Sequence, residues 1–421
     1  MRKITFILCF VNIFFSVKTF SQKTDSIEKY SLKFQMTSIY QWHPAFHAQY
    51  SGANSMGNEE QRALSLTSTL FLDVPVWKGG LFSFNPEMSG GEGLSLAKGL
   101  GGFPNGETFR IGEPKPVVYL ARMLLQQKFQ FNENHSLQLV AGKFGLADYF
   151  DGNSYSHDPR TQFLNWSLMT FGAWDYAANT RGYTDGIYAN YQFDTWQIRG
   201  SLSALPTNAN GPNLGFSFDK SYAVNVEVEK KITFENKDIS TIKLLGYRNL
   251  APMGNYNLAN TNYTTTPDIT STRENGRTKY GLGLNAEYSH SDTWGIFGRI
   301  SYNDGKNETW AFTEIDQSAS LGINVKGKMW ARPNDFTGFA FVANGLSASH
   351  QKYQKLGGNG FMIGDGNLNY GVEKIAEIFY SFAIPHTSFT LSPDYQFALN
   401  PGYNKDRGPI QFLALRFHTQ I

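Results

Sequence analysis

The stretch YAVNVEVEK, residues 222–230, decides the fold class. Apolar side chains alternate in it with one asparagine and two glutamates. Successive side chains of a β-strand point to opposite faces, so a strand here has one apolar face and one polar face. The same alternation recurs at residues 30–42, 64–74 and 389–399. The pattern predicts an all-β protein built from long amphipathic strands.

The composition excludes several other classes of protein. Of the 421 residues, 15 % are aromatic and 17 % are charged, which argues against global disorder. The mean hydropathy is −0.36 and the chain has a single long apolar run, so a bundle of transmembrane helices is excluded. A formal net charge of +2 gives no support for nucleic-acid binding.

The first segment predicts export from the cytoplasm. Residues 1–21 combine a basic start, Arg2 and Lys3, with a short apolar run and a small-residue cleavage site, which together are typical of a secretory signal peptide. We therefore expect one mature domain, residues 22–421. Cys9 is the only cysteine and lies in the signal, so disulfide bonds cannot hold the mature fold.

Alternation and turn residues predict sixteen strands, many of them longer than the typical strand of about 5–6 residues. About 9–11 residues are needed for a tilted strand to cross a bilayer. The strands are expected at residues 30–42, 61–76, 79–88, 117–131, 135–146, 183–193, 195–205, 219–232, 238–250, 277–290, 293–303, 316–327, 335–346, 372–384, 386–399 and 408–421.

The lengths of the connections alternate as well. Short turns, such as 77–80 and 132–134, alternate with long stretches, such as 89–116, 147–182 and 251–277. Short turns on one rim and long loops on the other are typical of an outer-membrane β-barrel with both termini in the periplasm. In lipid every backbone polar group needs a protein partner, and only a closed sheet has no open edge. We therefore predict a transmembrane antiparallel barrel with long extracellular loops.

A sixteen-stranded barrel leaves room for an aqueous channel, and strand phase predicts which polar side chains line it. Positive and negative groups are mixed, which favours a neutral polyhydroxyl solute over ions of one sign. Each of these groups could also simply solvate the wall or pair across strands. The wall candidates for solute contact are Arg122, Arg199, Glu287, Arg299, Glu373, Glu377, Asp394 and Arg416, with Lys33, Glu87 and Lys128 among further inward positions.

The connection 147–182 is the most informative of the long loops. Eight aromatic residues lie between Tyr149 and Tyr176, more than a water-exposed loop would keep, so at least this loop is expected to fold into the lumen. Its Arg160, Trp174, Asp175 and Arg181 are candidate solute contacts. Two interpretations stay open: the aromatic rings stack on sugars, or they form a core that holds the loop to the wall. In contrast, the glycine-rich segment 89–102 is expected to be a flexible extracellular loop.

Several runs of the sequence together are distinctive of one family. They are 142–144, 150–153, 157–166 (HDPRTQFLNW), 172–178 (GAWDYAA), 181–184, 334–338, 344–347, 364–366, 391–396, 400–404 and 406–409, together with Tyr370, Glu373 and Glu377. These runs resemble the carbohydrate-selective porins of the OprB type. This resemblance implies a sixteen-stranded barrel that passes monosaccharides and small oligosaccharides through a constriction lined by arginines and acids. The assignment of that constriction to particular residues comes from strand phase alone.

We therefore expect a passive, sugar-preferring porin in the outer membrane of a Gram-negative bacterium, with sugars as solutes and lipid as its surroundings. We expect no enzyme, cofactor, metal or nucleic acid. A general or anion-selective porin, a polysaccharide export pore and homo-oligomerisation stay open. The enzyme alternative would need a nucleophilic serine beside a histidine, for which Ser347 and His350 are the nearest candidates. The pair His43 and His47 is read as incidental rather than as a metal site.

Overall fold

The structure, a computed structural model, describes residues 30–111, 114–235 and 238–421. Its main element is a barrel of sixteen strands. They are β1 (Ser31–His43), β2 (Gln61–Trp77), β3 (Gly80–Gly91), β4 (Val117–Gln130), β5 (His135–Phe144), β6 (Thr184–Phe193), β7 (Trp196–Ser203), β10 (Tyr222–Thr233), β11 (Ile239–Ala251), β12 (Arg277–His290), β13 (Trp294–Asn303), β14 (Gln317–Lys326), β15 (Phe336–Gly345), β16 (Glu373–Ala383), β17 (Phe389–Leu399) and β18 (Ile410–Gln420). The predicted signal segment, 1–21, lies outside the described residues, so that expectation and the boundary at residue 22 stay predictions.

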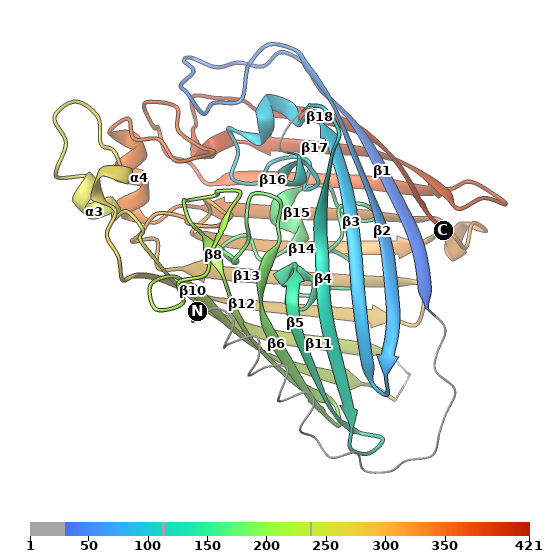
Figure 1. The fold of residues 1–421 in the computed structure, drawn as a ribbon. Helices are drawn as coiled ribbons and strands as arrows, with labels where there is room; N and C mark the ends of the chain where they lie inside the picture. The colour runs from blue at the N-terminus through green and yellow to red at the C-terminus, as the bar shows by residue number, and fades with distance from the viewer. Residues whose placement is uncertain (1–29, 112–113, 236–237) are drawn as a thin grey trace.

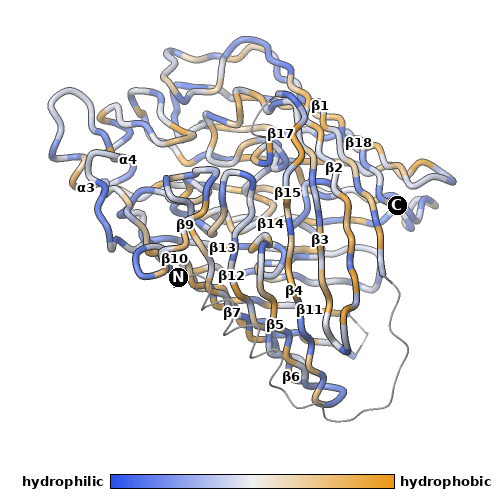
Figure 2. The backbone as a smooth tube through the Cα atoms, in the orientation of Figure 1, coloured by the Kyte–Doolittle hydropathy of each residue, from blue (hydrophilic) through white to orange (hydrophobic). Residues whose placement is uncertain are grey.

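The barrel closes because β1 pairs with β18, and all neighbouring strands are antiparallel (Figure 1). The prediction of sixteen strands is confirmed, and the observed bounds differ from the expected ones by a few residues. Outward side chains such as Leu282, Ile300 and Leu321 are exposed and apolar, whereas their strand neighbours face inward. Figure 2 shows hydrophobic and hydrophilic positions alternating along the strands. In the part of the chain that the structure describes, no helix is long and apolar enough to cross a membrane.

The connections segregate by length, as predicted. Tight turns join β2 to β3, β6 to β7 and β12 to β13, whereas long loops crowd the other end of the barrel (Figure 1). Three loops matter below: the glycine-rich loop (92–116), the inner loop (145–183) and the last loop (400–409). Short elements outside the barrel are η1 (Leu94–Ala97), η2 (Thr108–Arg110), η3 (Leu146–Asp148), α2 (Trp166–Met169), β8 (Leu205–Pro206), β9 (Leu214–Gly215), α3 (Tyr256–Ala259), η4 (Thr270–Thr272), η5 (Gly327–Trp330), α4 (Ala348–Lys355) and η6 (Pro401–Tyr403).

The inner loop folds into the lumen and builds an aromatic core there. Trp166 lies 4.5 Å from Phe312 between ring centroids, and it stacks on Phe103 at 5.2 Å. Tyr176 stacks on Phe312 at 4.9 Å. These rings are buried, so of the two interpretations of the loop's aromatic residues, the structure places most of them in a core. A ring in such a core is fixed by its neighbours and cannot offer its face to a passing solute.

The glycine-rich loop differs from its prediction as a flexible extracellular segment. The backbone N–H groups of Gly101 and Gly102 donate to Glu373 on β16 at 3.1 and 2.7 Å. The residues on either side of these two glycines, Leu100 and Phe103, are buried. The glycines allow the backbone to approach both the inner loop and the wall closely, because a Cβ at Gly102 would lie 2.5 Å from the Ser167 Oγ and 2.9 Å from the Ile375 Cδ1 on β16. Composition alone could not separate this use of glycine from flexibility.

Candidate functional site

Several wall residues predicted from strand phase hold the inner loop in place. Glu377 on β16 accepts hydrogen bonds from the backbone N–H groups of Leu164 and Asn165. Arg416 on β18 donates to three backbone carbonyls of the same loop, including that of Pro159 at 2.8 Å. Asp394 on β17 is buried beside them and accepts from Gln396 at 3.1 Å. These side chains face inward and bond to protein, although the Oδ2 of Asp394 and the Nε of Arg416 are buried without a hydrogen-bond partner among the described residues.

The same holds for wall residues on the opposite strands. Arg299 on β13 donates through its Nε to Asp151 of the inner loop at 2.9 Å. Glu287 on β12 accepts from the backbone N–H of Ser154 at 2.7 Å and from its Oγ at 2.9 Å. Arg199 on β7 forms ion pairs with two glutamates of β10, and its side chain is 12 % exposed. Arg299 is therefore buried, whereas Arg199 and Glu287 keep some contact with water.

Two candidates in the inner loop are anchors rather than exposed contacts. Trp174 is buried and donates from its indole N–H to the Oδ1 of Asn225 at 3.0 Å. Asp175 is fully buried and accepts the backbone N–H groups of residues 310–312 at 2.8 to 2.9 Å. Buried backbone N–H groups need acceptors, and one carboxylate can supply several strong hydrogen bonds. Asp175 therefore joins the inner loop to the loop that contains residues 310–312.

The remaining three candidates come together in one group, which we call the arginine–tyrosine cluster. It lies between β3, β4, the glycine-rich loop and the inner loop. Its centre is Arg160, whose guanidinium donates to Glu87 at 2.9 Å and to Glu107 at 2.8 Å. The members of the cluster are Glu87, Glu107, Arg110, Tyr119, Arg122, Asp148, Arg160, Arg181 and Tyr183.

Guanidinium groups and phenol rings are layered in the cluster. The guanidinium carbons of Arg110 and Arg122 both lie 5.3 Å from the ring centroid of Tyr183. Arg181 lies 4.1 Å above the ring of Tyr119, and both tyrosine hydroxyls donate to Glu87. Cation–π contacts and shared carboxylates fix these long side chains in one geometry. Burial would raise the pKa of Glu107, but Arg160 and Arg110 outweigh burial and hold that pKa below its usual range.

Arg122 and Asp148 form the part of the cluster that water reaches. The Nε of Arg122 donates to the carboxylate of Asp148 at 2.7 Å, and the second bond of this bidentate pair is 2.5 Å long. The side chains of Arg122 and Asp148 are 18 % and 32 % exposed. Burial raises the pKa of Asp148, but the charge and hydrogen bonds of Arg122, together with the backbone N–H of Gly145 and the charge of Arg110, keep the pKa below its usual value. This pair is charged at neutral pH and accessible to a solute.

Strand phase identified Arg122, and the inner loop supplied Arg160 and Arg181. Strand phase also predicts that Glu87 faces inward, but sequence reasoning missed Glu107, Arg110, Asp148 and the two tyrosines as site residues. Arg110 and Asp148 lie in loops, where no periodicity reports the direction of a side chain. Tyr183 lies within the quoted run 181–184 and could have been noticed there. Contact of each predicted residue with a sugar stays a prediction.

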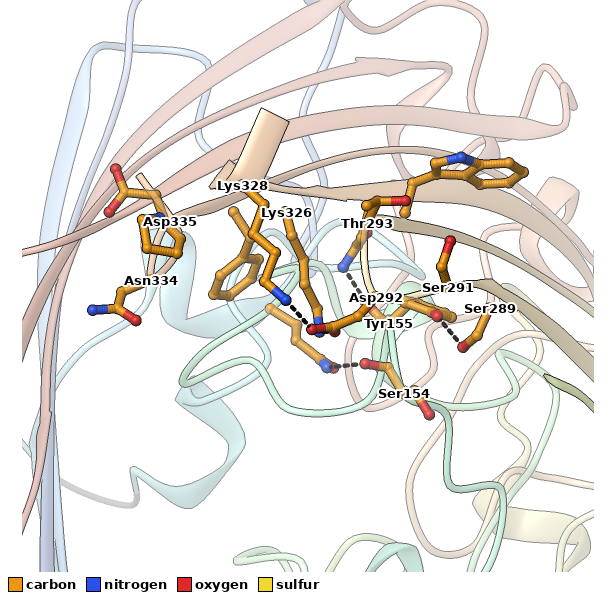
Figure 3. Close-up of a pocket in the computed structure, with 15 residues that line it drawn as sticks. Ser154, Tyr155, Ser289, Ser291, Asp292, Thr293, Lys326, Lys328, Asn334 and Asp335 are labelled. Carbon is orange, nitrogen blue, oxygen red and sulfur yellow. Dashed lines mark hydrogen bonds and ion pairs between the residues drawn. The ribbon is translucent and has the colours of Figure 1, made fainter. Parts of the chain in front are cut away.

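A cavity of about 480 Å³ lies at the turn end of the barrel, between the inner loop and β12 to β15. Figure 3 shows Ser154 and Tyr155 of the inner loop on one side of it, with Asp292 between Lys326 and Lys328. Hydrogen bonds from the two lysines lower the pKa of Asp292 to about 2. A smaller cavity of about 180 Å³ lies at the loop end and is lined by rings such as Phe109, Phe312 and Phe361.

The serine and histidine of the enzyme alternative have other roles. Ser347 is the N-cap of α4 and accepts from the backbone N–H of His350 at 3.3 Å. The Nδ1 of His350 lies 3.0 Å from Asp316, and its Nε2 faces Gln354 at 3.4 Å. The imidazole therefore does not contact a serine hydroxyl, as general-base catalysis would require. In the described ranges no three His, Cys, Asp or Glu side chains converge in a way that could hold a metal ion.

A closed barrel with an inward-folded loop and a charged, partly exposed cluster defines an outer-membrane channel. The sequence model described as carbohydrate-selective porin, OprB family, matches residues 74–421, and the chain belongs to this family. Its members are porins of the outer membrane, channels for sugars rather than enzymes. Lipid contact and oligomerisation stay predictions.

The fold is shared with solved channels. A high-pH structure of Pseudomonas putida OprB has a TM-score of 0.73 and 16 % identity, and the match covers 93 % of this chain and 94 % of that one. A low-pH structure of the same protein has a TM-score of 0.52 at 11 % identity, with 93 % of each chain covered. The outer membrane channel DcaP of Acinetobacter baumannii has a TM-score of 0.51 at 12 % identity, covering 95 % and 99 %. No curated protein matches the sequence.

Proposed function

We propose that this porin passes neutral mono- and small oligosaccharides by passive diffusion, and that the arginine–tyrosine cluster selects them. The observation that carries the proposal is the partly exposed Arg122–Asp148 pair beside the ring of Tyr183. A sugar hydroxyl both donates and accepts hydrogen bonds, so it can engage a guanidinium and a carboxylate at once. An ion of either sign meets one attractive and one repulsive group at the same place.

The filled centre of the barrel supports small solutes over polymers. The aromatic core around Trp166 and Phe312 occupies the lumen together with the glycine-rich and inner loops. A pore for a secreted polysaccharide would need a wide lumen, whereas buried side chains of these loops fill part of the lumen here. The mixed charge of the cluster likewise favours a neutral solute over the anion-selective alternative, because Arg110 and Arg122 each have a carboxylate partner.

The test is liposome swelling with the purified, reconstituted porin. A hexose is compared with an anionic and a cationic derivative of similar size, and we expect the hexose to enter several-fold faster than either. Equal rates for all three would overturn the proposal of sugar preference. Faster entry of the anion would favour the anion-selective alternative instead.

A single substitution ties the preference to the cluster. Arg122→Gln keeps a hydrogen-bonding side chain and removes the charge that balances Asp148. The rate of entry of the cationic derivative should therefore rise relative to that of the hexose. Arg248→Gln on β11 is the matched control, because Arg248 is exposed on the outward face. If both variants and the native porin gave identical swelling rates, Arg122 would have no part in selecting the solute.

A further inference from the structure

Two carboxamides face the lumen on the turn side of the cluster. Gln126 on β4 shares a strand face with Leu124, and Gln138 on β5 shares one with Val140, and both of these apolar residues are buried in the core. The Nε2 of Gln138 donates to the Oε1 of Gln126 at 2.7 Å. Both glutamines are only partly buried. They therefore form a hydrogen-bonded pair on a wall that water reaches.

The pair leaves one donor group and one acceptor unused. Within the described part of the chain, the Nε2 of Gln126 and the Oε1 of Gln138 have no hydrogen-bond partner. A carboxamide nitrogen offers two N–H donors, and its oxygen accepts. Adjacent hydroxyls on a sugar ring present a matching acceptor and donor. A monatomic ion, which donates no hydrogen bond, presents no such match.

The glutamine pair lies where a second binding site would follow the arginine–tyrosine cluster along one permeation path. Gln126 lies four residues from Arg122 on the same strand face, about 13 Å along β4 at the usual rise per residue. Between them on that face lies the buried, apolar Leu124. A sugar leaving Arg122 would therefore meet no hydrogen-bonding side chain of β4 on this face until it reaches Gln126.

The two glutamines are themselves uncharged, although charged side chains lie near them. Arg199 on β7 is paired with Glu227 and Glu229. Lys128 lies opposite Gln138 in the strand register and is exposed. Recognition at the pair therefore depends on hydrogen-bond geometry, since no carboxylate or guanidinium belongs to it.

We propose that Gln126 and Gln138 form a second sugar-binding site, on the periplasmic side of the arginine–tyrosine cluster, that recognises two adjacent hydroxyls of a neutral sugar. The proposal rests on the sugar-channel function given above and extends it. Two weak sites in series speed transit, because a solute leaving the first is captured by the second without being trapped.

The test measures sugar-induced reduction of single-channel current in planar bilayers, from which an apparent binding constant follows. Gln126→Met and Gln138→Met keep the side-chain length and remove the hydrogen-bonding groups. Each should weaken hexose binding by about tenfold. A deoxyhexose that lacks one of two adjacent hydroxyls should bind the native porin more weakly than the hexose, and this difference should vanish in both variants.

Gln192→Met on β6 is the matched control, because Gln192 is an exposed inward carboxamide without a role in the proposed pair. It should bind hexose as the native porin does. Folding of all variants is checked by heat-modifiable electrophoretic mobility, in which a folded barrel migrates differently before and after boiling. If the native porin binds hexose and both pair variants bind it equally well, the second site is overturned and the sugar-channel function stands. If the native porin shows neither hexose binding nor hexose preference in swelling, the function itself is overturned.

Discussion

Polar side chains face inward on two walls of the lumen, but loops cover them on one wall and leave them partly exposed on the other. On β13 to β18 the inward polar residues, such as Arg299, Glu377 and Arg416, are buried because loops lie on them and take their hydrogen bonds. On β4 to β7 inward residues such as Arg122 and Gln138 stay partly exposed. We call these the covered wall and the wet wall. Inward direction is thus necessary for solute contact, but the packing of loops decides which inward residues can make it.

Substitution of an inward polar residue should therefore have different effects on the covered wall and on the wet wall. On the covered wall a polar side chain satisfies buried backbone groups, so its loss should release a loop and change the size of the passage. On the wet wall a polar side chain meets water and solute, so its loss should change affinity and selectivity with the barrel intact. The expected effects below follow this order.

The largest effect is expected for Glu373→Ala on the covered wall. Glu373 accepts the backbone N–H groups of Gly101, Gly102 and Gly402, which would be left buried without an acceptor. Each such group costs about 1–3 kcal/mol. The glycine-rich loop and the last loop should detach, so single-channel conductance should rise several-fold and added protease should cut within 92–116.

Lys374→Ala is the control for this prediction. Lys374 is the next residue on β16, faces outward and is exposed. Its loss should alter neither conductance nor cleavage. If Glu373→Ala kept the native conductance and protease resistance, the glycine-rich loop would have to be held by other contacts, and the covered wall would lose its stated role.

A smaller effect is expected for alanine at two glycines with the same backbone conformation. Gly99 and Gly276 both have φ near +88°, which costs a non-glycine residue about 1–2 kcal/mol. A Cβ at Gly99 would also overlap the backbone of Met56, whereas one at Gly276 would have no neighbour within 4 Å. Gly99→Ala should therefore sensitise the glycine-rich loop to protease, whereas Gly276→Ala should leave its own loop, before β12, as resistant as in the native porin. An equal gain in sensitivity of the two loops would show that backbone conformation alone accounts for the cost.

The sixteen strands could be predicted because lipid imposes one rule on every strand. Alternation such as that of 222–230 reports which side chains face hydrocarbon, and the loop lengths report which end is which. The same phase correctly put Arg122, Glu377 and Arg416 inside the barrel. Lipid acts on each strand separately, so a local pattern is enough.

The division into a covered and a wet wall could not be predicted in this way. It depends on contacts between residues far apart in the chain, such as Glu373 with Gly101 and Arg160 with Glu87. Arg110 and Asp148 belong to the arginine–tyrosine cluster but lie in loops, whose irregular backbone leaves no periodic signal. The abundance of glycine in 89–102 predicts flexibility, because composition does not show that a wall carboxylate accepts hydrogen bonds from the glycine N–H groups.

The smallest effect concerns pH and belongs to the wet wall. Arg122 holds the pKa of Asp148 below the usual carboxyl value of about 3.9, against the effect of burial. A carboxylate with a depressed pKa contributes its stabilisation in full above the pKa of the unfolded chain and loses it as pH falls through the folded value. The Arg122–Asp148 pair should therefore persist from pH 8 to pH 5, so hexose block of the current should be constant over that range and weaken only below about pH 4. Asp148→Asn should leave the barrel folded and abolish the weakening of hexose block below about pH 4. A midpoint near pH 6 in the native porin would mean that another group governs sugar binding, and the wet wall would then need a different selecting residue.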